Sequence, residues 1–156
     1  MPLTVGSTAP DFTLVDTEKK PRTLKEFLGK KTVIAFYPGA FTGVCTKEMC
    51  TFRDSLAEMG TLNAQVVGIS VDSPFSNKAF GEQNRIGYPL LSDLTHEVSK
   101  EYCGLYDSFA MIPGYKASKR SVFVLDPKGT VKYAWISENP GAEPPYADVK
   151  AALASF

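Results

Sequence analysis

The chain has little of several features that mark particular classes of protein. It contains three cysteines, one histidine and one tryptophan in 156 residues. An odd number of cysteines argues against a framework of structural disulfides and favours a reducing, cytoplasmic setting. No apolar run approaches membrane-spanning length. The N-terminus lacks a basic region followed by an apolar stretch, so we expect no signal peptide.

Charge of one sign is also not in excess, because 17 Lys and Arg residues balance 17 Asp and Glu residues. The sequence therefore gives no reason to expect nucleic acid or an anionic membrane as a partner. Glycine-rich phosphate loops and haem-attachment motifs are missing, so we expect no cofactor. The candidate zinc ligands Cys45, Cys50, His96 and Cys103 fit no zinc spacing, and no metal is expected.

What is present is the composition of an ordinary globular protein, with 44% hydrophobic and 22% charged residues. This length is sufficient for one domain with a substantial core. Internal repeats and low-complexity linkers are absent from the sequence. We therefore expect residues 1–156 to form a single domain.

The order of the periodic segments predicts an α/β protein with a thioredoxin-like fold, a central mixed sheet flanked by helices. Strands and helices alternate in the first half, as in a parallel βαβ unit. The turn Asp126-Pro-Lys-Gly129 predicts an antiparallel hairpin near the end. Predicted strands are Thr32–Tyr37, Gln65–Val71, Ser121–Leu125 and Val131–Ile136. Predicted helices are Leu24–Leu28, Thr42–Met59, Phe75–Arg85, His96–Tyr102 and Tyr146–Ala154.

The most informative segment is Tyr37-Pro-Gly-Ala-Phe-Thr-Gly-Val-Cys45. It follows a buried strand, and Pro38 and Gly39 end that strand. Thr42 is a favourable N-cap, so Cys45 falls in the first turn of a helix. Free N–H groups and the positive end of the helix dipole favour a thiolate over a thiol at this position. A cysteine that acts only as a small buried hydrophobe is the alternative.

Pro38, Thr42 and Cys45 match the Pro-x-x-x-Thr-x-x-Cys motif of the peroxiredoxin family, and the resemblance covers nearly the whole chain. It implies a thiol-dependent peroxidase that reduces hydrogen peroxide and organic hydroperoxides through a sulfenic acid on Cys45. Further matching segments are Thr8–Leu14, Val67–Ser73, Tyr88–Asp93 and Arg120–Asp126.

The resemblance also implies roles for the neighbours of Cys45. Arg120 would be the guanidinium that stabilises the thiolate and the leaving oxygen, although a solvated surface charge is the alternative. Thr42 would contact the sulfur and the bound peroxide, and Pro38 would shield the thiolate from water. Glu48 would hold the arginine in place, or would be a plain surface residue. The segment Leu105–Lys119 is predicted to be a loop beside this site.

Cys50 lies on the same predicted helix, turned roughly 140° away from Cys45. The core-facing stripe of this helix consists of Cys45, Met49, Phe52, Leu56 and Met59. The Cys-x-x-x-x-Cys spacing resembles the bacterioferritin-comigratory or Q-type branch, in which the second cysteine resolves the first. The surrounding residues instead resemble the one-cysteine AhpE-like branch, so recycling and assembly both stay open. The partners implied are a thioredoxin- or glutaredoxin-like reductant and a possible second copy in a homodimer.

Two other functions use the same kind of thiol. A thioredoxin-type disulfide reductase would normally carry Cys-x-x-Cys and a proline just before the strand that begins near Arg120, and the chain has neither. A redox sensor without peroxidase turnover needs only the sensitive Cys45. Cys103 is predicted to be a partly buried residue outside the cycle, with Gly104 as a helix C-cap. His96 is predicted to lie on the surface.

Overall fold

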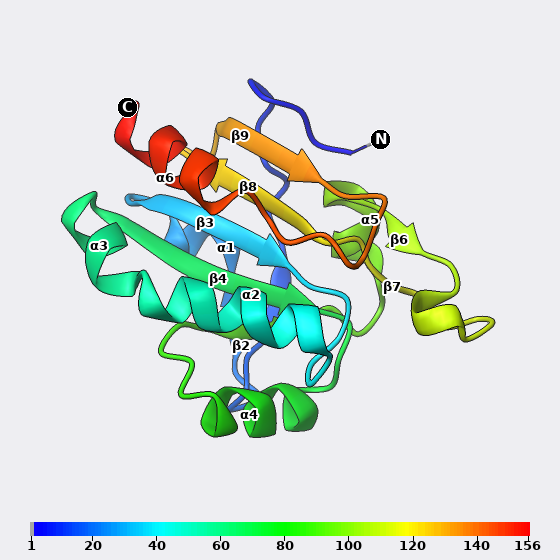
Figure 1. Ribbon diagram of the computed structural model, residues 1–156. Coiled ribbons are helices and arrows are strands. Elements are labelled where there is room, and N and C mark those ends of the chain that lie inside the picture. The colour runs from blue at the N-terminus through cyan, green and yellow to red at the C-terminus, as the bar shows by residue number, and fades with distance from the viewer. Residues whose placement is uncertain (1) are drawn as a thin grey trace.

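The structure is a computed structural model that describes residues 2–156. Its main strands are β1 (Thr13–Val15), β2 (Pro21–Thr23), β3 (Lys31–Phe36), β4 (Ala64–Ser70), β5 (Leu90–Ser92), β8 (Ser121–Leu125) and β9 (Val131–Ile136). They form one seven-stranded sheet in the order β2-β1-β5-β4-β3-β8-β9 (Figure 1). β3, β4 and β5 are parallel, whereas β8 is antiparallel to both β3 and β9. The predicted mixed sheet and its closing hairpin are confirmed.

Helices cover both faces of this sheet. They are α1 (Leu24–Phe27), α2 (Gly43–Asp54), α3 (Leu56–Thr61), α4 (Pro74–Gln83), α5 (Glu97–Tyr102) and α6 (Tyr146–Ala154). Side chains from α2, α3, α4 and α6 pack into one apolar cluster, and side chains from α1 and α5 pack into a second. Figure 1 shows α2 and α6 on the near face and α1 behind the sheet. The core stripe predicted from Cys45 to Met59 lies in the first cluster.

The predicted helix Thr42–Met59 is wrong in one respect, because it is divided at Ser55. The Ser55 hydroxyl donates to the carbonyl of Thr51 at 3.0 Å. A serine hydroxyl that bonds back to the preceding turn competes with the helical hydrogen bonds and bends the helix. Periodicity alone could not locate this break, because the apolar stripe continues across it.

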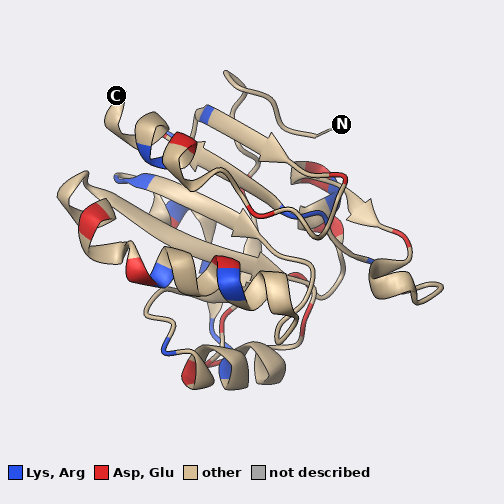
Figure 2. Ribbon diagram, viewed as in Figure 1, with Lys and Arg blue, Asp and Glu red and all other residues tan. Residues whose placement is uncertain are grey.

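The remaining differences from the predicted elements concern short pieces. β1, β2 and β5 have three residues each, which is too short for a period of two to be recognised. The predicted loop Leu105–Lys119 contains the paired strands β6 (Leu105–Tyr106) and β7 (Ala117–Ser118) and the 3₁₀ turn Phe109–Met111. Within residues 2–156, no helix is long and apolar enough to cross a bilayer. Acidic and basic residues are interspersed over the elements (Figure 2).

Candidate active site around Cys45

The strand register brings the two ends of the site together. In the antiparallel pair of β3 and β8, Phe36 lies opposite Ser121. The start of β8 therefore lies beside the end of β3, and Arg120 lies next to the loop that follows Tyr37. That loop leads into α2, whose first turn carries Cys45. Residues about 75 positions apart in the sequence thus meet at the carboxyl end of a core strand, where α/β proteins commonly bind ligands.

Arg120 contacts Cys45 directly. Its Nη2 lies 3.1 Å from the Cys45 Sγ, and its Nη1 donates to the Glu48 Oε1 at 2.7 Å. The side chains of Arg120 and Glu48 are 1% and 0% exposed, and Cys45 is 0% exposed. Arg120 is therefore a buried cation between two acidic groups, and neither Arg120 nor Glu48 is the surface charge that the sequence left open.

The loop between β9 and α6 holds the guanidinium from the other side. The Pro140 carbonyl accepts from Arg120 Nε at 3.1 Å and from Nη2 at 2.8 Å. The Arg120 main-chain N–H donates to the Tyr106 hydroxyl, which itself donates to the Ser137 carbonyl. Sequence reasoning missed Pro140, because a main-chain carbonyl that acts across the fold leaves no signal in side-chain identity.

Thr42 occupies the predicted N-cap position, but its hydroxyl makes a different hydrogen bond. No side-chain cap hydrogen bond forms at the start of α2. The Thr42 hydroxyl instead donates to the Gly39 carbonyl at 2.7 Å, which closes the loop on itself. Pro38 and Gly39 are both buried. Pro38 and Gly39 thus form a buried turn beside Cys45.

Asp72, at the exit of β4, anchors the same loop, which the sequence did not predict. Its Oδ2 accepts from the Ala40 N–H and from the Ser70 hydroxyl, each at 2.8 Å. Phe41 has a positive φ of 66°, an uncommon conformation for a residue with a side chain. Its ring packs edge-on against Phe80 of α4. These contacts fix the path of the chain from β3 into α2.

The pKa of Cys45 differs from the sequence expectation. Burial is the largest influence and raises the pKa of the thiol above its usual value. The Arg120 charge is the largest influence that lowers this pKa, followed by the Thr42 side chain and the Gly39 main chain, while the Glu48 charge raises it. The lowering predicted from the helix start is therefore outweighed, because the Cys45 side chain itself is covered by protein and not by water.

Cys50 faces away from this site, as the 140° rotation predicted. It is half-buried, and its Sγ lies 3.7 Å from the side-chain oxygen of Asn84, in the turn after α4. Arg53, one turn further along α2, donates to the main-chain carbonyl of Asn84. Cys45 and Cys50 are both free thiols on one uninterrupted helix.

The other sequence candidates lie elsewhere. Cys103 is buried in the opposite apolar cluster, where burial raises the pKa of its thiol to about 12. Gly104 takes the left-handed conformation that the helix end requires, one residue beyond the C-cap Cys103. His96 precedes α5 and is half-buried, not fully on the surface as expected. Among residues 2–156, no three His, Cys, Asp or Glu side chains are placed to hold a metal ion.

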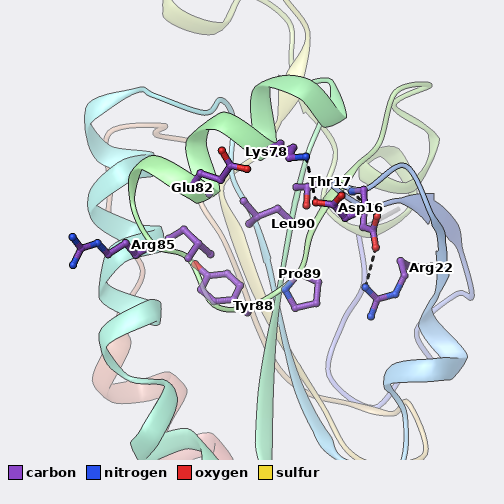
Figure 3. A pocket seen from close by; sticks show the side chains of 12 residues that line it. Asp16, Thr17, Arg22, Lys78, Glu82, Arg85, Tyr88, Pro89 and Leu90 are labelled. Atoms are coloured by element: carbon purple, nitrogen blue, oxygen red, sulfur yellow. Dashed lines mark hydrogen bonds and ion pairs between the residues drawn. The ribbon is translucent and has the colours of Figure 1, made fainter.

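Two hollows in the protein surface do not include Cys45. One, of about 450 Å³, is lined by the segment Leu105–Met111 and by Lys119, Glu138 and Pro140. The other, of about 340 Å³, lies between α4 and the β1–β2 turn (Figure 3). Four of its charged side chains form pairs, Arg22 with Asp16 and Lys78 with Glu18.

Comparisons with known proteins agree with this geometry. A profile of the AhpC/TSA family matches residues 5–134. Peroxiredoxin Q, chloroplastic, of Sedum lineare is 43% identical over 133 residues, which cover 85% of this chain and 69% of that protein. This chain belongs to the peroxiredoxin family.

Relatives within the peroxiredoxins include bacterial proteins of similar length. A putative peroxiredoxin bcp of Haemophilus influenzae is 38% identical, covering 83% of this chain and 84% of that protein. The crystal structure of peroxidoxin BcpB from Mycobacterium tuberculosis superposes with a TM-score of 0.82 at 36% identity, covering 96% and 95% of the two chains. The chain spans little more than half the length of several plant peroxiredoxin Q proteins that it matches.

Proposed function

We propose that the chain is a thiol-dependent peroxidase that reduces hydrogen peroxide and organic hydroperoxides. Peroxiredoxins carry out this chemistry with a cysteine thiolate. The single observation that carries the proposal is the 3.1 Å contact between Arg120 Nη2 and Cys45 Sγ in a buried site. A guanidinium at this position stabilises both the thiolate and the oxygen that leaves.

In the first step, the Cys45 thiolate attacks one peroxide oxygen. A sulfur–oxygen bond forms, the oxygen–oxygen bond breaks, and the other oxygen leaves as hydroxide or alkoxide and takes a proton. The sulfur is oxidised to a sulfenic acid while the peroxide is reduced. Arg120 supports the developing negative charge. Thr42 and Pro38 shape the loop that holds the peroxide and keeps water away from the sulfur.

In the second step, we propose that the Cys50 thiol attacks the Cys45 sulfenic acid, with release of water and formation of a disulfide. Two positions five residues apart on an intact helix have Cα atoms roughly 8.6 Å apart. A disulfide needs about 4.4–6.8 Å. The side chains also point away from each other, so α2 must unwind over its first turns. A thioredoxin- or glutaredoxin-like dithiol would then reduce the disulfide.

The relatives named peroxiredoxin Q and bcp support this two-cysteine route over the one-cysteine alternative. A mass measurement after one equivalent of peroxide separates the two routes. A loss of about two daltons mapped to Cys45 and Cys50 supports resolution within the chain. A stable sulfenic acid, or a disulfide that joins two chains, would assign resolution to another thiol.

The peroxidase proposal is tested by peroxide consumption in the presence of dithiothreitol. Repeated turnover supports the enzyme, and Cys45→Ser should abolish even a single turnover. One stoichiometric oxidation without turnover would instead indicate a redox sensor. Insulin reduction without peroxide consumption would indicate a disulfide reductase.

We further propose that the protein works in a reducing compartment, the cytoplasm, and forms a homodimer. Three free thiols support the reducing setting. Met111 and Ile112, adjacent in the chain, are 93% and 52% exposed, and they offer an apolar contact for a second copy. Sedimentation of the reduced protein, compared with Met111→Lys, tests the dimer. A monomeric wild type would refute it.

A further inference from the structure

Glu48 contacts Arg120, but the mechanism above gives it no chemical role. Its carboxyl group is fully buried, and only one of its two oxygens is satisfied. Oε1 accepts from Arg120, whereas Oε2 has no hydrogen-bond partner among residues 2–156. A buried carboxylate oxygen without a donor destabilises the charged form of the group, because nothing replaces the water that it has lost.

The charge balance of the site also disfavours the charged form of Glu48 beside a Cys45 thiolate. Arg120 carries one positive charge and contacts two groups that can each become negative, Cys45 and Glu48. If both were ionised, the dry site would hold an uncompensated negative charge. If only one is ionised, the site is neutral. Uncompensated charge in a buried site is costly, so the neutral arrangements are favoured.

Among residues 2–156, the other titratable groups that act on Glu48 supply no compensating cation. Those groups are Glu143, from the loop before α6, Tyr37 at the end of β3, Tyr88 before β5 and Tyr146 in α6. Burial raises the pKa of all three tyrosines, so they stay neutral near pH 7. Lys47 pairs with Glu143 at 3.1 Å, and both side chains of this pair are partly exposed.

We propose that Cys45 and Glu48 share one proton across the guanidinium of Arg120, so that Glu48 is neutral when Cys45 is the reacting thiolate. The S–H bond of Cys45 breaks, an O–H bond forms on Glu48, and no electrons are exchanged. Arg120 then faces a single anion, the sulfur that attacks. The proposal rests on the function proposed above. Glu48 then acts through Arg120 and Cys45, by adjusting the charge of the site.

The ionisations of Cys45 and Glu48 are also coupled. Burial raises the pKa of Glu48 to about 8, against the lowering effect of Arg120. The charged form of Glu48 raises the pKa of Cys45. Each group therefore ionises more easily while the other is neutral. Two interacting groups of this kind lose their protons in two steps that belong to the pair.

The test is the pH dependence of single-turnover peroxide reduction, followed by mass spectrometry in a Cys50→Ser, Cys103→Ser background. The shared proton predicts that the rate rises in two steps, with a plateau between them. Glu48→Gln keeps an oxygen that accepts from Arg120 but cannot titrate. It should show one step, at a pH between the two steps of the parent. Glu143→Gln, the matched control, should keep both steps.

A second measurement needs no variant at position 48. Infrared spectra of the parent protein should show the carbonyl stretch of a buried protonated carboxyl group near pH 7, which weakens as pH rises through about 8. A single step in the parent profile, or a missing carbonyl band, would overturn the shared proton while peroxide reduction persists. Absence of peroxide reduction at every pH would instead refute the proposed function.

Discussion

Arg53 and Asn84 are joined by a hydrogen bond from the guanidinium Nη1 to the main-chain carbonyl, which ties α2 to the turn after α4. Cys50 contacts the side chain of the same asparagine. Cys50 must leave this asparagine before the proposed disulfide with Cys45 can form, and Arg53 helps to hold the asparagine in place. The turn after α4 therefore acts on the recycling step, although it is remote from peroxide chemistry.

Loss of this tie should speed disulfide formation. Arg53→Met keeps much of the apolar stem but removes the hydrogen bond. We expect the step from sulfenic acid to disulfide to accelerate about two- to fivefold, the size typical of a half-exposed polar contact. Rapid mixing with peroxide and acid quenching measures the step. Arg85→Met, at a neighbouring exposed arginine, is the control, and an equal acceleration there would rule out a specific tie.

Removal of the guanidinium should affect the first chemical step. Arg120→Ala should lower the second-order rate with peroxide by about 10²–10³, the usual cost of losing one charge-stabilising donor. Arg120→Lys should not restore the rate, because an ammonium group cannot reach Cys45, Glu48 and Pro140 with a fixed fork. Lys119→Ala removes the adjacent, half-buried charge, which pairs with Glu138, and serves as the control. A rate for Arg120→Ala within about threefold of wild type would contradict the assignment.

Asp72 should affect the rate of reaction with peroxide through the loop that it anchors. Asp72→Ala removes the acceptor for the Ala40 N–H, and we expect the peroxide rate to fall about tenfold as the loop loses its fixed path. Asp72→Asn still offers one oxygen and should recover most of the rate. Stopped-flow kinetics measures both variants. If the two lose activity equally, the carboxylate acts by its charge and not by holding the loop.

Cys103 should be dispensable for turnover, whereas Cys50 should not. Burial in the opposite cluster keeps the Cys103 thiol protonated and remote from Cys45. Steady-state peroxide reduction with a thioredoxin-like reductant should be unchanged in Cys103→Ser and lost in Cys50→Ser. Both variants should keep one turnover. A loss in Cys103→Ser equal to that in Cys50→Ser would make Cys103 the resolving thiol.

Glu48 should also make stability depend on pH. Its pKa is about 8 in the folded protein and about 4.3 when unfolded. Between these values the folded state holds one more proton, so stability falls as pH rises. Below about pH 4.3 this loss of folding stability is absent, and above about pH 8 it is complete. Urea unfolding at pH 5 and pH 8 should show a larger loss in wild type than in Glu48→Gln. Equal losses would contradict this pKa.

The sequence predicted the parts of this molecule that depend on local pattern. The core strands β3, β4, β8 and β9, the hairpin turn and the helix start at Thr42 all follow from periodicity and turn chemistry. The juxtaposition of Arg120 with Cys45 was expected only from family resemblance. The pairing of Phe36 with Ser121 explains it physically, but register is set by tertiary packing, which no local window contains.

The sequence did not predict contacts made by the backbone or by burial. The Pro140 carbonyl, the Asp72 anchor and the Asn84 contact with Cys50 all join segments far apart in the chain. The predicted lowering of the Cys45 pKa is wrong because it considers the helix start alone and not burial. A helix N-terminus lowers a thiol pKa by a local effect, whereas desolvation depends on everything packed around the sulfur.

The break at Ser55 limits how much structure must melt when Cys45 and Cys50 meet. α2 has 12 residues, near the length at which a free-standing helix in water is marginal. Its order therefore depends on packing against the sheet, and part of that support is lost once Cys45 leaves its position. Because α3 is a separate segment beyond Ser55, α2 can behave as a cooperative unit of its own. The redox state of two sulfurs would then control the folding of a single helix while its neighbour stays intact.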